Sequence, residues 1–539
     1  MVLPEPLGPF HVSYGDFELR RSKAPAEPSA GNGDHGHHVH PPLFRVYYPT
    51  DGNAEERREV ERSAWLPHVA YLYGYICAMI PPFSFFASIL TWLLSRITYL
   101  LIKPYAAIRC LPARPFISRA SLLRHLNHPH ADPTTSGGEN PEGRLPVVLF
   151  SHGLWSMRST YTQFCFDLAS HGYVVVAPEY TDGSACMAAE TDGEEEEEGG
   201  WGGGKGGRVK WIPHERMDVD FFEVPMEVRH RQLQQRMAAL RSILALLHQF
   251  NKGHVSDSRN AITSAARLLP SSLAGRLDLS HIALAGHSFG GATAAFLAGV
   301  AEQPINGFHL SLSPAVHGGR SDGDGDMDGN EKKGPLVSRV SSVVVLDTWW
   351  RPLPDEAIAL AGGKAALLCI DTEGLNAARN VVARKRFLQG RLLSWRDRWL
   401  QIVKEQAKQD GEAEEKGVGG KGVGTEGEEA RKGSGRMDGE TESVTELIVL
   451  VGSAHQDPSD LALVAPAIMK SAKMAGAIPP PIFHRINSGA ALRFLHQNFP
   501  LAKKYGLPVP PALAEDAVHI QHVDIPEYVK DLDQIAVPH

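Results

Sequence analysis

The pentapeptide Gly-His-Ser-Phe-Gly at residues 286–290 stands between two segments of different character. Residues His281 to Ala285 before it are typical of a buried strand, and the small and apolar residues from Gly291 onward are typical of a helix. A turn this tight needs flanking residues without a Cβ, and it exposes the serine hydroxyl at the end of the sheet. We therefore predict that Ser288 is a nucleophile on a strand–turn–helix unit; the alternative is a glycine-rich turn with an idle serine.

Short apolar runs alternate with amphipathic stretches along most of the chain. The runs are rich in Val, Leu and Ile, as parallel strands buried on both faces are. This alternation predicts a mostly parallel sheet with helices on both faces, which is an α/β fold. The predicted strands are Pro146 to Phe150, Tyr173 to Ala177, His281 to Ala285, Val343 to Leu346, Ala366 to Ile370 and Leu447 to Val451, and the predicted helices are Tyr161 to Ser170, Val228 to His248, Gly291 to Val300 and Leu461 to Ala475.

Five polar segments lack hydrophobic periodicity, and we expect them to be long disordered inserts. They are about 24–42, 129–144, 187–208, 317–335 and 406–442. Roughly 430 residues remain without them, which suits a single large α/β domain. We interpret the histidines at 35, 37, 38 and 40 and the glutamates at 194–198 as solvated side chains rather than metal sites.

Composition excludes several classes of protein. The 54 Lys and Arg against 62 Asp and Glu, a net charge of -8, provide no cationic surface for phosphates, so no nucleic-acid partner is expected. The cysteines are odd in number and show no C-x-x-C spacing, so we expect buried, reduced thiols in the cytosol. They are Cys77, Cys110, Cys165, Cys186 and Cys369. The first residues show neither a signal-peptide pattern nor the glycine that myristoylation requires, so secretion is not expected.

A serine hydroxyl is a poor nucleophile on its own, so it needs a base, and the base needs an orienting acid. Hydrolases with this turn carry the three residues in the order Ser, acid, His. His455 follows one predicted strand and Asp347 ends another, at the strand ends where α/β sheets gather their sites. Asp371 ends a strand in the same way, and spacing does not choose between the two acids. We expect His287 to make local contacts rather than to act as the base.

A tetrahedral oxyanion needs fixed N–H donors. One donor in such sites is the residue after the nucleophile, here Phe289, and the other lies on a loop after an earlier strand. The loop after Phe150 contains Gly153, which allows close backbone approach, and Leu154, whose N–H is the second candidate donor.

Several motifs follow one another in a definite order. They are Ser151-His-Gly-Leu, Asp167-Leu-Ala-Ser-His-Gly-Tyr-Val-Val, Gly286-His-Ser-Phe-Gly-Gly-Ala-Thr, Leu346-Asp-Thr-Trp with Pro352 and Asp355-Glu356, and Gly452-Ser-Ala-His-Gln-Asp457 with Asp460; Arg45-Val-Tyr-Tyr-Pro and Ala490 to Phe499 extend the set. Together they resemble the platelet-activating factor acetylhydrolases, in particular the monomeric plasma and intracellular type II branch. The resemblance covers nearly the whole chain apart from the inserts.

This resemblance implies an α/β-hydrolase fold and a calcium-independent phospholipase A2 activity that removes short or oxidised sn-2 acyl groups from phospholipids. The acid of that family lies in the Leu-Asp-x-Trp motif, which favours Asp347 over Asp371. The sequence departs from the family at Trp155, where a small residue is expected, at Trp350-Arg351 and in the inserts. These departures concern acyl-chain preference more than the chemistry.

Residues 83–102 form an apolar segment long enough to span a bilayer. Its Leu, Ile and Phe residues favour insertion by roughly 3 to 6 kcal/mol, but Arg96 opposes it by about 3 kcal/mol, so a true span is the less favoured interpretation. Helical phase indicates an amphipathic helix that either packs its apolar face on the protein or lies on a lipid surface. Phe86, Ile89, Leu90, Leu93, Leu94 and Ile97 share one face, Ser88, Thr91, Ser95 and Thr98 share the other, and Trp92, Tyr99 and Lys103 are candidates for the interface.

These observations predict a cytoplasmic serine esterase that acts on phospholipids with short or oxidised sn-2 groups and requires no metal or organic cofactor. Ser288 is its predicted nucleophile, His455 its base and Asp347 its orienting acid, with Leu154 and Phe289 as oxyanion donors. Peripheral membrane attachment through residues 70–103 stays open. Two other hypotheses are a general carboxylesterase or lipase with the same three residues, and a membrane-associated scaffold that keeps the fold without turnover. The intact Ser, Asp and His argue against the scaffold.

Overall fold

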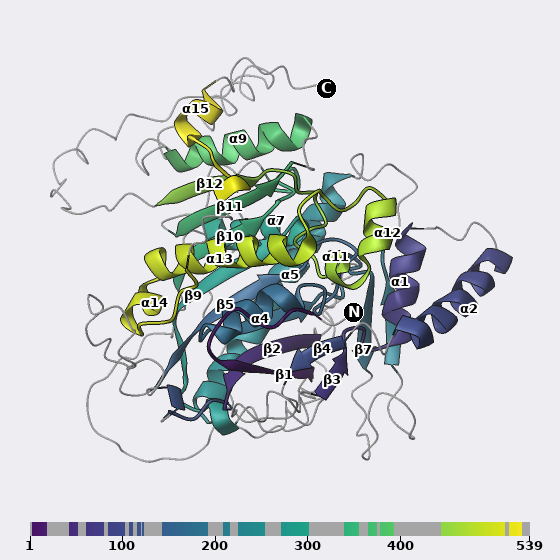
Figure 1. Ribbon diagram of the computed structural model, residues 1–539, viewed down its shortest axis with the longest axis horizontal. Helices are drawn as coiled ribbons and strands as arrows, with labels where there is room; N and C mark the ends of the chain where they lie inside the picture. Colours follow the sequence, from purple (N-terminus) through teal and green to yellow (C-terminus); the bar gives the residue numbers. More distant parts are fainter. Residues whose placement is uncertain are drawn as a thin grey trace, which may run out of the picture.

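The structure is a computed structural model (Figure 1), and it describes most of the predicted core elements. It describes residues 3–18, 43–51, 61–79, 85–102, 107–110, 116–119, 121–122, 143–191, 209–215, 225–253, 271–300, 339–354, 365–373, 378–392, 444–511 and 517–530. The predicted inserts 24–42, 317–335 and 406–442 lie outside these residues, as do 129–142 and 192–208. Residues 187–191, which we predicted to begin an insert, instead form a strand.

Nine strands form the central sheet, in the order β1-β2-β6-β5-β9-β10-β11-β12-β13. All six predicted strands are present, and the other three lie toward the edges of the sheet. The bounds are β1 His11–Glu18, β2 Leu43–Thr50, β5 Leu145–Ser151, β6 Val174–Glu179, β9 Leu277–His287, β10 Arg339–Leu346, β11 Ala366–Thr372, β12 Thr445–Leu450 and β13 Ile520–His522.

Neighbouring strands from β6 to β12 run parallel, whereas β1, β2 and β13 add antiparallel edges. The prediction of a mostly parallel sheet is confirmed. Every residue of β5, β6 and β11 is buried, because helices cover both faces and leave no side of these strands to water. Their continuous apolar sequences follow from this double burial.

The helices that connect the parallel strands lie on opposite faces of the sheet. From β5 the chain passes through α4 (Thr162–Ser170) to β6 on one side, and from β9 it passes through α7 (Phe289–Val300) to β10 on the other side. Right-handed crossovers that leave in opposite directions must use opposite faces. The adjacent strands β5 and β9 therefore flank the point where the winding reverses, which is where α/β sheets bind ligands.

Two helix groups complete the layers (Figure 1). The helix α13 (Pro480–Asn498) packs against α4, while α5 (Met226–Asn251) packs behind α7. The predicted helix from 461 to 475 is two short helices, because Pro466 begins a new one and cannot continue the first. The remaining bounds are α9 Ala378–Leu392, α11 Leu461–Val464, α12 Pro466–Ser471, α14 Pro500–Lys504 and α15 Ile525–Val529.

A peripheral group of elements lies beside the sheet, with α1 and α2 on the right of Figure 1. It contains α1 (Val69–Met79), α2 (Phe85–Ile102) and two small antiparallel pairs, β3 (Glu61–Ala64) with β4 (Ala107–Cys110) and β7 (Met187–Thr191) with β8 (Val209–Pro213). Among the helices that the structure describes, none is long and apolar enough to cross a membrane.

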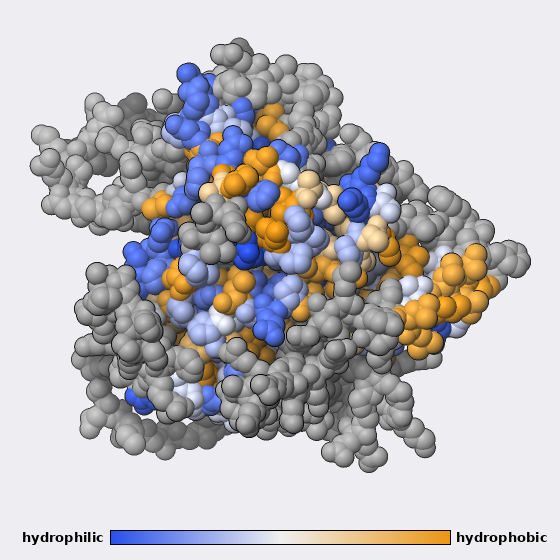
Figure 2. All heavy atoms as spheres, in the orientation of Figure 1, coloured by the Kyte–Doolittle hydropathy of each residue, from blue (hydrophilic) through white to orange (hydrophobic). Residues whose placement is uncertain are grey.

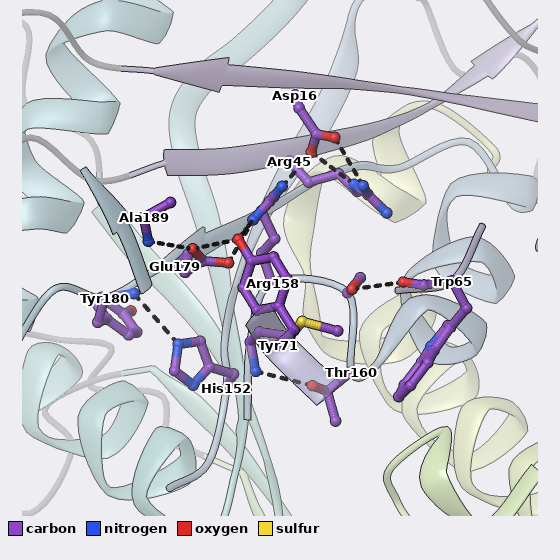
Figure 3. Close-up of polar contacts among 12 residues, drawn as sticks. Asp16, Arg45, Trp65, Tyr71, His152, Arg158, Thr160, Glu179, Tyr180 and Ala189 are labelled. Carbon is purple, nitrogen blue, oxygen red and sulfur yellow. Dashed lines mark hydrogen bonds and ion pairs between the residues drawn. The ribbon is translucent and has the colours of Figure 1, made fainter. Parts of the chain in front are cut away.

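Buried charges join this group to the antiparallel edge of the sheet (Figure 3). Arg45 of β2 forms a double hydrogen bond with Asp16 of β1, at 2.8 Å for both pairs of atoms. Arg158 donates to Asp16 at 3.1 Å, to Glu179 of β6 at 2.5 Å and to the hydroxyl of Tyr71 of α1 at 2.7 Å. All these side chains are almost fully buried, so removal of one partner would leave an unpaired charge in the interior.

Candidate active site

The turn after β9 has the geometry that its glycines predict. Ser288 has a φ of 54°, in the left-handed region that non-glycine residues rarely occupy. A Cβ at Gly286 would lie 2.2 Å from the oxygen of Gly290, and a Cβ at Gly290 would lie 2.0 Å from the oxygen of Ser151. Only glycine fits at these two positions. The helix α7 begins immediately after Ser288, so the serine stands at the carboxyl end of β9.

Ser288, His455 and Asp347 form one hydrogen-bonded chain. His455 Nε2 lies 3.0 Å from Ser288 Oγ, and His455 Nδ1 lies 2.6 Å from Asp347 Oδ2. A carboxylate can only accept, so Nδ1 carries the proton and Nε2 is left to accept from the serine hydroxyl. The three residues occur in the order Ser, acid, His on a mostly parallel sheet, and this arrangement is that of an α/β-hydrolase fold.

Asp347 is held as a carboxylate at the end of β10. Besides His455, it accepts the N–H of Thr372 at 3.1 Å and the hydroxyl of Thr372 at 2.5 Å. Burial alone would raise the pKa of Asp347, but the His455 imidazole and the Thr372 hydrogen bonds outweigh it, so the pKa is lowered. Its φ of 38° places a second strained residue at the site.

The alternative acid, Asp371, is engaged elsewhere. It forms a buried ion pair with Arg384 of α9, and Arg384 also donates to the hydroxyl of Tyr528 in α15. Burial raises the pKa of Asp371 to about 6, although Arg384 opposes this rise. Geometry therefore favours Asp347 as the partner of His455, and Asp371 links α9 to the sheet.

His287 contacts His455, the predicted base. Its Nε2 lies 2.8 Å from the carbonyl oxygen of His455, and its Nδ1 lies 2.7 Å from the hydroxyl of Tyr161. Because a carbonyl only accepts, Nε2 carries the proton and Nδ1 accepts from the tyrosine. Burial, followed by the nearby His455, lowers the pKa of His287 to about 3, so this ring stays neutral. These partners lie 168 and 126 residues away in the sequence, so His287 makes long-range contacts where we expected local ones.

The two predicted oxyanion donors follow the strands that flank the winding reversal. Leu154 lies just after β5, and Phe289 begins α7 just after β9. Within the described residues, neither backbone N–H donates to an acceptor of the chain. Two N–H groups beside a serine, a histidine and a carboxylate can stabilise the charge that develops when an acyl carbonyl is attacked.

Trp155, the residue after Leu154, is a third non-glycine residue with positive φ, at 54°. Its N–H donates to the oxygen of Ser184, and its ring contacts His214 edge-on with 5.2 Å between centroids. The side chain is 36% exposed. The other departure from the family pattern, Trp350, is fully buried and packs on Phe387. Of these two tryptophans, Trp155 is therefore the one that is open to solvent.

Sequence reasoning missed Arg236, a fully buried residue of α5 that reaches the loop after β5, which carries the predicted donor Leu154. Its Nη1 donates to the carbonyl oxygen of His152 at 2.8 Å, and its guanidinium lies over the ring of Phe289 at 4.4 Å. A signal was present in the sequence, because Arg236 falls between Leu233 and Leu240 on the apolar stripe of the predicted helix. A charge in such a stripe indicates a buried partner. Thr372 and Tyr161 gave no comparable signal.

The described residues contain no group of three His, Cys, Asp or Glu placed to hold a metal ion. The histidines at 35–40 and the glutamates at 194–198 lie outside those residues. Cys165, Cys186 and Cys369 are buried as predicted, whereas Cys77 is only partly buried. The side chain of Cys110 is not among those described.

Three known proteins are similar in sequence to parts of this chain. A "Platelet-activating factor acetylhydrolase" of Gallus gallus is 33% identical over 159 residues, which cover 28% of this chain and 35% of that protein. One of Cavia porcellus is 26% identical over 282 residues, 52% of each chain. A "Putative phospholipase A2" of Schizosaccharomyces pombe is 29% identical over 165 residues, 29% of this chain and 35% of that protein. The matches thus span between about a third and a half of these relatives.

A solved ferulic acid esterase from Streptomyces cinnamoneus superposes with a TM-score of 0.45 and 13% sequence identity, covering 97% of this chain and 99% of its own. A family model described as "Platelet-activating factor acetylhydrolase, isoform II" matches residues 131–507, which hold Ser288, Asp347, His455 and both N–H donors. This match covers well over half of the sequence. The chain belongs to the platelet-activating factor acetylhydrolase, isoform II family.

Proposed function

We propose that this protein is a serine esterase that hydrolyses the short or oxidised sn-2 acyl group of phospholipids such as 1-alkyl-2-acetylglycerophosphocholine, and that it does so without calcium. The observation that carries the proposal is the chain from Asp347 through His455 to Ser288, beside two N–H groups that the described residues leave without an acceptor. Membership of the family supports the choice of a phospholipid ester as the substrate.

The first half of the reaction forms an acyl-enzyme. Ser288 Oγ attacks the sn-2 carbonyl carbon while His455 Nε2 takes the hydroxyl proton, and Asp347 stabilises the imidazolium through Nδ1–H. The N–H groups of Leu154 and Phe289 bind the oxyanion. The intermediate collapses when the bond from carbon to the glycerol oxygen breaks. That oxygen takes the proton from His455, and the lyso-phospholipid leaves.

In the second half, water attacks the acyl-Ser288 ester. His455 takes a proton from the water and returns it to Ser288 Oγ as the carbon–Oγ bond breaks, which releases the short carboxylic acid. Every proton in both halves moves to or from His455, so the proposed steps need no metal and no organic cofactor.

The test is hydrolysis of a 2-acetyl phosphatidylcholine and of its long-chain counterpart, with excess chelator, by wild type and by Ser288→Ala. We expect turnover of the acetyl substrate, loss of that turnover in the variant, and covalent labelling of the wild type alone by a fluorophosphonate. Turnover of only a simple soluble ester would favour a general carboxylesterase. An absence of labelling and of any turnover would favour the non-catalytic scaffold.

We further propose that α2 lies on the surface of a lipid layer. Its hydroxyl-bearing face turns inward, with Thr91 8% and Ser95 1% exposed, so the alternative in which the apolar face packs on the protein is not supported. The outward face is apolar, as Figure 2 illustrates at the right of the molecule. Its residues are Ile89, Leu90, Trp92, Leu93, Leu94, Ile97, Leu100 and Leu101, each about half exposed or more.

The chemistry of this face suits a phospholipid interface. Arg96 lies 4.4 Å over the ring of Trp92, and Tyr99 is partly buried, so polar and aromatic groups border the apolar side chains as they do in interfacial helices. Lys103 lies outside the described residues. Gly74 brings α1 against the Cys186–Met187 backbone, where a Cβ would meet the oxygen of Cys186 at 2.3 Å. This contact ties α1 to residues 184–187, and the oxygen of Ser184 accepts from the N–H of Trp155, next to the candidate donor Leu154.

We also propose a cytoplasmic location. Cys165 and Cys186 are buried thiols, and burial raises the pKa of both well above the ordinary value, so they remain protonated and inert. Buried free thiols are typical of proteins in a reducing compartment.

A further inference from the structure

His152 lies between the end of β5 and the predicted oxyanion donor, and its ring is buried. The Nδ1 atom lies 2.7 Å from the carbonyl oxygen of Gly153. The Nε2 atom lies 3.4 Å from the backbone N of Tyr180, as Figure 3 shows. The carbonyl can only accept and the N–H can only donate. The ring therefore carries its proton on Nδ1, and Nε2 is the acceptor.

The carbonyl that His152 contacts belongs to the same peptide unit as the N–H of Leu154. That unit is planar and trans, so its C=O and N–H point in opposite directions, and fixing one fixes the other. A hydrogen bond to the carbonyl also polarises the peptide, which makes its N–H a stronger donor. The ring of His152 thus acts on Leu154 through the peptide between Gly153 and Leu154.

Arg236 of α5 forms a hydrogen bond with the loop that contains His152 and Leu154. Its Nη1 donates to the His152 carbonyl at 2.8 Å, its Nη2 to Ser184 Oγ at 2.7 Å, and its Nε to Asp182 Oδ2 at 3.1 Å. The same guanidinium lies over the ring of Phe289, the residue that holds the other N–H donor. Burial and then the charge of Arg236 lower the pKa of His152 well below its ordinary value, so its ring stays neutral at physiological pH.

We propose that His152 is a positioning residue for the oxyanion hole: its Nδ1–H sets the orientation and donor strength of the Leu154 N–H, and Arg236 holds His152 in place. This inference rests on the proposed esterase function and assigns a role that neither the triad nor the two N–H donors explain. Ser288, His455 and Asp347 do not contact His152 in the interactions that the structure describes. Its effect is therefore expected on the stability of the oxyanion alone.

Two variants of His152 distinguish the contributions of its two ring nitrogens. In His152→Asn the amide nitrogen takes the place of Nδ1 and can still donate to the Gly153 oxygen, whereas in His152→Gln the amide reaches the place of Nε2 and cannot. We expect kcat of His152→Asn to stay within about threefold of wild type. We expect kcat of His152→Gln to fall about 10- to 100-fold with little change in KM, because a weakened oxyanion donor affects only the transition state.

A trifluoromethyl ketone, which forms a tetrahedral oxyanion with the serine, provides a second readout. Its affinity for His152→Gln should fall by the same factor as kcat, while thermal unfolding of both variants stays close to wild type. Equal kcat in wild type and His152→Gln, or equal losses in both variants, would overturn the inference. If neither variant folds, ¹⁵N NMR of the wild-type histidines decides: a neutral Nδ1–H tautomer for His152 supports the inference, and an Nε2–H tautomer overturns it.

The same assays distinguish this inference from the proposed function. A wild type that turns over neither a phospholipid nor a soluble aryl acetate would overturn the esterase itself. A wild type that is active on the aryl acetate, with His152→Gln equally active, would overturn only the role of His152.

Discussion

At the scale of single residues, geometry favours one of two candidate carboxylates as the partner of His455. Asp347 and Asp371 end adjacent strands, in sequence contexts of the same form. The Thr372 hydroxyl and the His455 ring orient Asp347, whereas Arg384 of a later helix neutralises Asp371. These partners lie 13, 25 and 108 residues from the acids that they contact, so spacing could not choose between the acids. The preference for Asp347 came only from the family resemblance.

A matched pair of variants tests this assignment. Asp347→Asn should lower kcat on a soluble ester about ten-thousandfold, because the amide no longer holds the imidazole in its working tautomer. Asp371→Asn should keep kcat within about tenfold but lower the free energy of unfolding by about 3 kcal/mol, because Arg384 loses its buried partner. Stopped assays and urea titrations measure the two effects. The opposite pattern would assign the acid to Asp371.

At the scale of elements, the strands and helices that carry the site were predictable, and their surroundings were not. Continuous apolar runs identified β5, β9, β10 and β12 because double burial leaves a strong pattern. The strands β1 and β2 were missed, because a charged residue interrupts the apolar sequence of each one. These two charges, Asp16 and Arg45, are buried as an ion pair. The phase of α2 was predicted correctly, but which face meets the protein depends on tertiary contacts that no local pattern contains.

The orientation of α2 leads to a prediction about lipid binding. Replacing Leu90, Leu94 and Ile97 by serine should weaken binding to phosphatidylcholine vesicles by about fivefold per residue, since each removes roughly 1 kcal/mol of apolar transfer energy. Vesicle sedimentation measures the binding, and turnover of a soluble ester should be unchanged. Ile468→Ser on α12 is the control, because Ile468 is as exposed as Ile97, at 52% against 51%. Equal loss in the control, or no loss in the triple variant, would contradict the proposal.

At the scale of the whole molecule, the buried charges between the sheet edge and α1 make the free energy of unfolding depend on pH. Burial would raise the pKa of Asp16, but Arg45 and Arg158 outweigh it and lower the pKa from 3.8 to about 2. The stability that Asp16 contributes is therefore present above pH 3.8 and is lost as the pH falls toward 2. About 1 kcal/mol of it should be gone by pH 3, and about 2 kcal/mol at still lower pH.

Comparison of wild type with Asp16→Asn isolates this effect. At pH 7 the variant should be less stable by about 3 kcal/mol, because two buried guanidinium groups lose their carboxylate. The difference between the two proteins should shrink below pH 4, as the wild-type carboxyl also becomes neutral. Urea unfolding at a series of pH values measures it. Glu527→Gln, at an exposed ion pair with Lys530, should show no such trend, and a difference for Asp16→Asn that does not vary with pH would rule out this carboxylate as the source.

The two N–H donors of the site follow neighbouring strands, and this has a consequence for how the chain tolerates added sequence. The separation of those donors is set by the parallel pairing of β5 with β9, a property of the sheet rather than of any long loop. Residues 152–161 connect β5 to α4, and Ser288 alone connects β9 to α7. The longest polar segment, 406–442, falls between α9 and β12. A fluorescent or affinity domain inserted within 406–442 would leave the pairing of β5 with β9 in register. We therefore expect such a fusion protein to keep the catalytic activity of the chain without the insertion.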